Sequence, residues 1–134
     1  MADQVKITAG LLRSAVEKIS QRLTTSLTRK LRDLTPVDTA FAQSNWIPSI
    51  GSPAEGTDGE RPTEVGQRAS AALQEAGIAA VDGGYSLDQG PLFVANNVTY
   101  IEKLNNGSSR QAPKAFVQAG IGQTILDLDK VILS

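Results

Sequence analysis

"VKITAGLLRSAVEKISQRLTTSLTRKLRDL", residues 5–34, has the pattern of one long α-helix. It contains no proline, and apolar residues recur in it at steps of three or four, the spacing of one face of an α-helix: Leu12, Val16, Ile19, Leu23, Leu27, Leu31 and Leu34. A helix of about 28 residues spans roughly 42 Å, which is long for a globular protein. We therefore expect a helix over about 5–34 that projects beyond the body, its apolar stripe covered either by its own domain or by a neighbouring subunit.

The other faces of this helix are basic. Residues 1–34 hold seven Lys or Arg against three Asp or Glu, whereas residues 35–134 hold six against eleven. A helix segment of net charge +4 is thus joined to a body of −5. This asymmetry is typical of contact with nucleic acid or with an oppositely charged subunit, and it also occurs on a solvated helix face.

Composition excludes several classes of chemistry. The 134 residues, 40% apolar and 20% charged, fit one globular domain. Cys and His are absent, which rules out thiol nucleophiles, disulfides, imidazole acid–base catalysis and zinc sites with N/S ligands. No phosphate-binding glycine motif occurs, and Ser108 and Ser109 have no histidine to act as base. We expect no enzyme, no cofactor and no metal.

The N-terminus shows no basic segment leading into an apolar run, and no stretch approaches the ~20 apolar residues of a membrane span. From this we expect an intracellular, soluble protein without a membrane partner.

The rest of the chain predicts an α+β fold with short elements around a small sheet. Pro36 must end the long helix, because proline lacks an N–H and biases the preceding residue away from the α region. After it we expect a turn capped by Asp38 or Thr39, an extended segment at 46–50 that Pro48 keeps to a sheet edge, and a flexible loop at 51–62. Next come a helix from Thr63 to Ala76 ended by Gly77, a weak strand at 78–81 and a buried strand at 92–95. The chain then forms a short helix closed by Asn106 or Gly107 and a helix at 114–132 started by Pro113.

Two blocks of sequence carry a resemblance. "LTPVDTAFAQSNW" (34–46) resembles a Pro-Val-Asp-Thr-Gly pattern followed by Ser-x-Trp, and "LFVANNVTYIEKLNNGSSRQAPKAFV" (92–117) resembles Asn-Asn-x-Pro-Tyr followed by Ser-x-Gln-Ala-Pro. Both patterns, in this order, occur in the neck or tail-completion proteins of long-tailed bacteriophages, the lambda minor tail protein Z-like family. The motif residues expected to have structural roles are Pro36, Asp38, Thr39, Trp46, Asn96, Asn97, Tyr100, Gly107 and Pro113.

Three positions depart from the family pattern. Ala40 stands in place of its glycine, Phe41 in place of its arginine and Thr99 in place of its proline. If the family's glycine needs a positive φ, we expect Ala40 to adopt an ordinary helical conformation instead.

The resemblance implies a single tail-completion or neck domain over 1–134. Such a protein is made in the host cytoplasm and assembles in the virion as a hexameric ring between the head connector and the tail tube. Its partners would be further copies of itself, a head-closure or connector protein, and a tail terminator or tube protein, with non-specific contact to DNA in the channel. As subunit-interface residues we predict Arg13, Lys18, Arg22, Arg29, Arg32, Arg110 and Gln111.

The basic helix leaves two orientations open, since it can face an acidic neighbour or the DNA channel. We expect Tyr100 and Phe116 to belong to the core, and the 51–62 loop to become ordered on assembly. The alternative function is a small intracellular DNA-binding protein that uses the basic helix for phosphate contacts.

Overall fold

The computed structural model describes residues 2–36, 40–63, 68–107 and 114–133. Its architecture is α+β, as predicted, with a two-stranded sheet and several helices. The elements in chain order are α1 (Ala2–Leu34), α2 (Phe41–Ser44), β1 (Ile47–Ile50), α3 (Ala72–Asp82), the short 3₁₀ helix η1 (Leu87–Gln89), β2 (Leu92–Ala95), α4 (Ile101–Asn105), α5 (Phe116–Leu126) and α6 (Leu128–Leu133).

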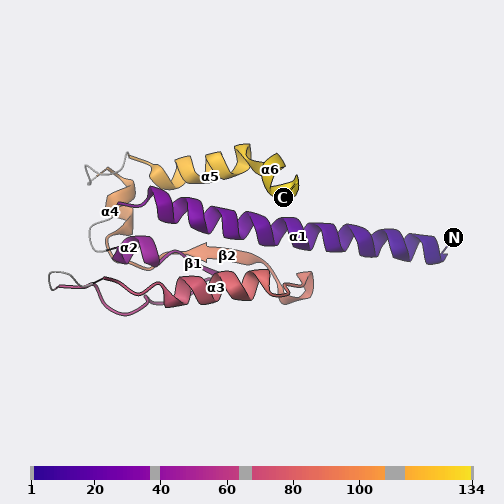
Figure 1. Cartoon of the computed structure of the whole chain (residues 1–134), viewed down its shortest axis with the longest axis horizontal. Coiled ribbons are helices and arrows are strands. Elements are labelled where there is room, and N and C mark those ends of the chain that lie inside the picture. The colour runs from indigo at the N-terminus through magenta and orange to yellow at the C-terminus, as the bar shows by residue number, and fades with distance from the viewer. Residues whose placement is uncertain (1, 37–39, 64–67, 108–113, 134) are drawn as a thin grey trace.

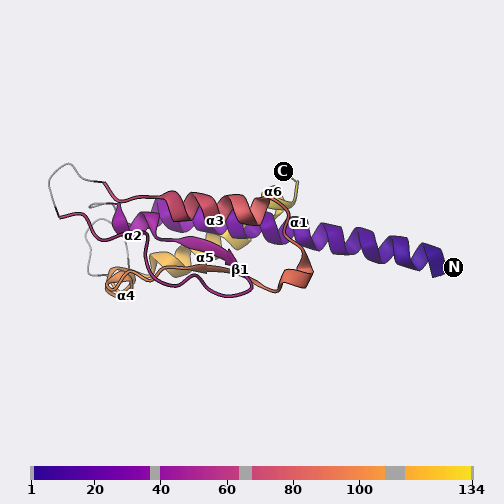
Figure 2. The same cartoon turned by 90° about the horizontal axis from the view of Figure 1, so that it is seen from below.

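Helix α1 is the axis of the molecule. In Figure 1, α5 and α3 flank its C-terminal half on opposite sides, and both strands and α3 contact α1. The N-terminal half of α1 extends past all of these elements in both views (Figures 1 and 2). The predicted long, projecting helix is therefore confirmed.

The sheet pairs β1 and β2 in antiparallel fashion, with Ile47 opposite Ala95 and Ile50 opposite Leu92. Pro48 lies in β1, opposite Val94. Because both strands of a two-stranded sheet are edges, a proline can be accommodated there without disrupting an interior ladder. The predicted extended segment and the predicted buried strand thus pair with each other, although they lie far apart in the sequence.

Helix α3 differs from its prediction at both ends. It begins at Ala72 rather than Thr63 and continues through Gly77 to Asp82, so the predicted strand at 78–81 is wrong. Gly77 is instead a contact point, since a Cβ built there would lie 2.5 Å from the Pro48 carbonyl oxygen. The glycine lets α3 pack closely on β1.

A distant side chain supports the start of α3. One carboxylate oxygen of Asp58 accepts hydrogen bonds from the Leu73 amide at 2.9 Å and from the Ser70 hydroxyl at 3.0 Å. The Asp58 amide in turn donates to Asn45 Oδ1 at 2.6 Å. The 51–62 loop is therefore tied both to α3 and to the turn before β1, and its ordering on assembly stays a prediction.

The core lies between α1, β1 and α5. Leu31, Trp46 and Phe116 form one buried cluster, and Phe116 is fully buried, as predicted. Tyr100 is half-buried and packs against a second cluster around Phe41, Ala42 and Val98.

The C-terminal region contains two helices where one was predicted. Ala115, at φ 63°, precedes α5, and Asp127 interrupts the helix before α6 begins. Asn105 caps α5, because its Oδ1 accepts the Val117 amide at 2.9 Å. Gly107, at φ 96°, follows α4 in a left-handed conformation, as predicted.

The turn before α2 corrects another expectation. Ala40 precedes Phe41 with φ 64°, in the left-handed region, and not in the ordinary helical conformation predicted for it. Ala40 therefore has a backbone conformation that glycine adopts more easily than an L-residue does. The predicted caps Asp38 and Thr39 lie outside the described residues, as does Pro113.

Candidate interaction surfaces

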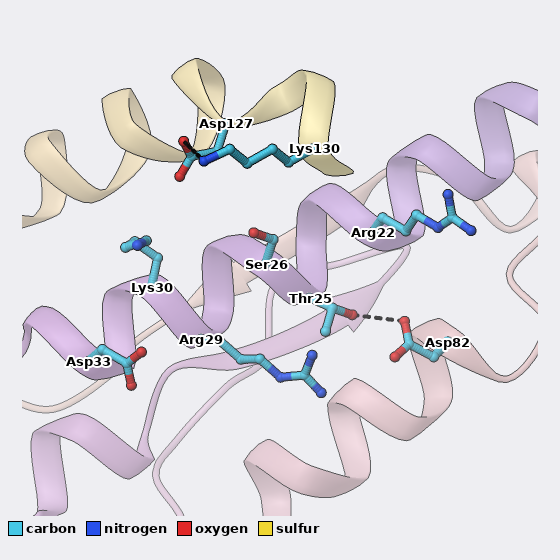
Figure 3. A pocket seen from close by; sticks show the side chains of 9 residues that line it. All are labelled: Arg22, Thr25, Ser26, Arg29, Lys30, Asp33, Asp82, Asp127 and Lys130. Atoms are coloured by element: carbon cyan, nitrogen blue, oxygen red, sulfur yellow. Dashed lines mark hydrogen bonds and ion pairs between the residues drawn. The ribbon is translucent and has the colours of Figure 1, made fainter. Parts of the chain in front are cut away.

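A charged groove runs along one side of α1. It encloses about 480 Å³ and is bounded by α1, by the C-terminal end of α3 and by the junction between α5 and α6 (Figure 3). Its lining residues are Arg22, Thr25, Ser26, Arg29, Lys30, Asp33, Asp82, Asp127 and Lys130. The six from α1 recur at steps of three or four, so helical periodicity alone places them on one face.

Charges of both signs line this charged groove, four cationic side chains and three carboxylates. Each carboxylate has a partner within the chain. Asp82 accepts a hydrogen bond from Thr25 Oγ1 at 2.8 Å, Asp127 pairs with Lys130 at 3.9 Å, and Asp33 pairs with Arg32 at 3.4 Å. This mixture suits a polar protein surface better than a continuous phosphate backbone, which the carboxylates repel.

The predicted interface residues separate into groups. Arg22 and Arg29 lie together in the charged groove, whereas Arg32 is outside its lining. Lys18 is exposed on α1 and is also outside that lining. Arg110 and Gln111 lie outside the described residues.

Arg13, also predicted as an interface residue, forms ion pairs within its own chain. Its guanidinium is 2.8 Å from Asp88 Oδ1 and 3.7 Å from Glu17 Oε2, and Glu17 accepts the Leu87 amide at 2.8 Å. The hydrogen bond to Asp88, together with the charge of that carboxylate, raises the pKa of Arg13. These contacts fasten η1 to the side of α1 near the point where the helix leaves the body.

The predicted motif residues form internal hydrogen bonds. Trp46 is buried, and its indole N–H donates to Thr35 Oγ1 at 2.7 Å. Asn96 donates to the Ala42 carbonyl at 2.8 Å, and Asn97 donates to the carbonyl of Ala54 at 2.7 Å. These side chains connect the turn at α2, the 51–62 loop and the end of β2, which is a structural role.

An apolar groove lies on another side of α1, between β2 and α5. It encloses about 240 Å³, and its lining residues are Leu23, Thr24, Leu27, Leu92, Val94, Ile121, Thr124 and Ile125. Figure 2 shows α5 and the strands on the same side of α1. Ile125 is 62% exposed and Leu126, beside it, is 81% exposed.

The apolar stripe of α1 resolves into two halves. Leu31, at 2% exposure, packs in the domain's own core. Leu11 and Leu12, at 69% and 66%, and Val16, at 40%, lie in the N-terminal half of α1 and are exposed. Own-domain packing therefore covers only the C-terminal half of the stripe.

Sequence reasoning missed Lys30, Lys130, Asp82 and Asp127 as members of the charged groove. Lys30 follows Arg29 on the basic helix, so periodicity could have found it. The other three come from α3, α6 and the residue between α5 and α6, and no local signal links those positions to α1.

Within the described ranges, no group of three or more acidic side chains could hold a metal ion. Over the same part of the chain, no helix combines the length and apolar character needed to cross a bilayer. Comparison of the chain with family models, curated proteins and solved structures gave no match.

Proposed function

We propose that this chain is a non-enzymatic virion protein of the bacteriophage head–tail junction. In this proposal it assembles as a ring between the head connector and the tail tube. The sequence resemblance in the two motif blocks supplies the class of protein. The observation that carries the proposal is the exposure of Leu11 and Leu12 near the point where α1 extends beyond the body.

Exposed apolar residues on a projecting element favour an assembly role. Large apolar side chains that cluster on one exposed face are typical of protein–protein contact. A ring subunit also needs two different surfaces, because each copy contacts two neighbours through heterologous interfaces. The projecting half of α1 and the exposed residues of α5, Ile125 and Leu126, offer two such surfaces on one chain.

The proposal is tested by electron microscopy of lysates from the phage that encodes this chain, with a stop codon placed early in its gene. We expect filled heads to accumulate beside free tails, because the junction cannot be completed. A suppressor strain that restores the full chain should restore joined particles. Ordinary infectious virions from the stop-codon phage would contradict the proposal.

A second candidate function is DNA binding, and the clustering of Arg22, Arg29 and Lys30 on α1 favours it. Phosphate binding releases counterions, so affinity for free duplex would fall steeply with the logarithm of salt concentration. Titration of the purified chain with duplex DNA at several salt concentrations measures this slope. The junction proposal predicts that partner proteins, and not free duplex, are needed for stable binding.

A further inference from the structure

We propose that Asn106 is a site of spontaneous deamidation, with the backbone nitrogen of Gly107 as the attacking group. Asn106 is exposed at the C-terminal end of α4, and Gly107 follows it. Asparagine is among the thermolabile residues of proteins. A following glycine leaves the next backbone nitrogen unshielded, because it has no Cβ. The inference goes beyond the proposed assembly function and does not depend on it.

The reaction needs only the chain and water. The Gly107 nitrogen attacks Cγ of Asn106, so that an N–Cγ bond forms and the Cγ–Nδ2 bond breaks. The Gly107 amide proton passes to solvent, and the side-chain nitrogen takes up a proton and leaves as ammonia. Water then opens the resulting five-membered succinimide. Addition of water at Cγ gives aspartate, and addition at the backbone carbonyl carbon gives isoaspartate.

Hydrogen bonding separates Asn106 from the other four asparagines of the chain. Each of those four uses its side chain to bond a backbone group: Asn45, Asn96, Asn97 and Asn105. Within the part of the chain that the structure describes, the Asn106 side chain forms no hydrogen bond. Its Cγ is therefore the one that can meet a backbone nitrogen without first losing a bonded partner.

The following residue is a second difference among the asparagines. The other four are followed by Trp46, Asn97, Val98 and Asn106, and each of these has a side chain beside its backbone nitrogen. Gly107 is the one glycine that follows an asparagine. The most accessible nitrogen thus lies next to the asparagine whose side chain is least restrained.

Asn105 provides the closest comparison, because it is adjacent in the same helix. Its Oδ1 accepts the Val117 amide at 2.9 Å, and its Nδ2 donates to the Gln118 side chain at 2.9 Å. Its carbonyl accepts the Ala115 amide at 2.6 Å. Asn105 is therefore fixed against α5, whereas the next side chain along, that of Asn106, is exposed.

Ring closure requires the last turn of α4 to open. Asn106 has ψ 3°, and the Gly107 amide donates to the Leu104 carbonyl at 3.2 Å, so the attacking nitrogen is engaged at the helix end. Helix α4 has only five residues, and the ends of so short a helix open at little free-energy cost. We therefore expect opening of this turn, and not global unfolding, to limit the reaction.

Deamidation changes both charge and backbone at the connection between α4 and α5. A carboxylate replaces a neutral amide, so the formal net charge of −1 becomes −2. The new charge lies at the C-terminal end of α4, where the helix dipole is also negative. Isoaspartate in addition lengthens the backbone by one methylene group, directly after the residue that fixes α4 to α5.

Peptide mapping by mass spectrometry tests the inference on the purified full chain. The folded chain is incubated at mildly alkaline pH and physiological temperature, and a sample digested without incubation corrects for conversion during digestion. Replacement of NH₂ by OH raises the mass by about 1 Da, and fragmentation assigns the gain to one residue. We expect Asn106 to convert about tenfold faster, or more, than each of the other four, because those must first break hydrogen bonds.

Asn106→Gln is the matched control. It keeps the side-chain amide but has one more methylene group, so the five-membered ring cannot close. The peptide that contains this glutamine should keep its mass through the same incubation. A folded wild-type chain in which Asn106 stays intact, or in which another asparagine converts at the same rate, would overturn the inference.

Discussion

The indole N–H of Trp46 donates a 2.7 Å hydrogen bond to the hydroxyl of Thr35. Thr35 follows the last residue of α1, and its hydroxyl donates onward to the Leu31 carbonyl at 2.6 Å. Both side chains are buried. This pair fixes the end of α1 against the segment that enters β1, and therefore helps set the direction in which the helix leaves the body.

Thr35→Val should lower the free energy of unfolding by about 1–3 kcal/mol, because it leaves a buried indole N–H without its acceptor. Thr28→Val is the matched control. Thr28 is also buried and makes the same bond to the carbonyl four residues earlier, but among the described contacts it accepts none from an indole. Urea denaturation measures both losses. Equal losses would show that the Trp46 bond contributes nothing of its own.

Gly77→Ala should destabilise the protein by about 1–3 kcal/mol, since the new Cβ would lie 2.5 Å from the Pro48 carbonyl oxygen and push α3 away from β1. Gly122→Ala is the control in α5, where a Cβ would have no neighbour within 4 Å. That change should stabilise by about 0.5–1 kcal/mol through helix propensity. Thermal unfolding of the two variants should shift in opposite directions, and a neutral Gly77→Ala would refute the close contact.

Ala40→Gly should stabilise the protein by about 0.5–1 kcal/mol. Ala40 has φ 64°, a conformation that costs an L-residue about 1–2 kcal/mol, and glycine avoids most of that cost. Ala42→Gly, two residues along in α2, should destabilise, because glycine there loses buried contacts and gains chain entropy in the unfolded state. A lower melting temperature for Ala40→Gly would contradict the left-handed conformation.

Leu31→Ala should cost about 2–5 kcal/mol, as expected for truncation of a buried leucine. Leu12→Ala, on the exposed half of the same stripe, should change the free energy of unfolding by less than about 0.5 kcal/mol. Denaturation curves of the monomeric proteins provide the comparison. Similar losses at the two positions would mean that the N-terminal half of the stripe is buried in the isolated chain.

Arg22→Glu combined with Arg29→Glu should reduce phage infectivity while the isolated fold survives, because both side chains line the charged groove. Arg68→Glu combined with Lys103→Glu is the control. It makes the same change in charge at two exposed positions outside this groove. Plaque counts from complemented phage give the readout. Undiminished infectivity of the groove variant would remove the charged groove from the assembly interface.

Local signals sufficed to predict the long helix and both strands. The steps of three and four in α1 identified its apolar face, and the short apolar run at Leu92–Ala95 identified β2. The prediction that Gly77 ends a helix was wrong, because the glycine is needed for tertiary packing: it accommodates Pro48 within α3. The start of α3 was missed for a similar reason, since Asp58 lies 15 positions before the Leu73 amide that it caps.

The candidate surfaces were only partly predictable. Periodicity placed Arg22 and Arg29 on one side of α1, but Lys130 reaches the same groove from α6 through the packing of the C-terminal helices. The division of the apolar stripe into buried and exposed halves depends on where the body ends along α1. The spacing of the apolar residues is the same in both halves. The sequence therefore could not show whether the stripe is covered by its own domain or by a neighbouring subunit.

The most direct test of the junction proposal is a cryo-electron microscopy reconstruction of the neck of the phage that encodes this chain. We expect a ring at the head–tail junction in which every subunit accommodates the 33-residue helix α1. A neck whose density is fully accounted for by other proteins would contradict the junction proposal.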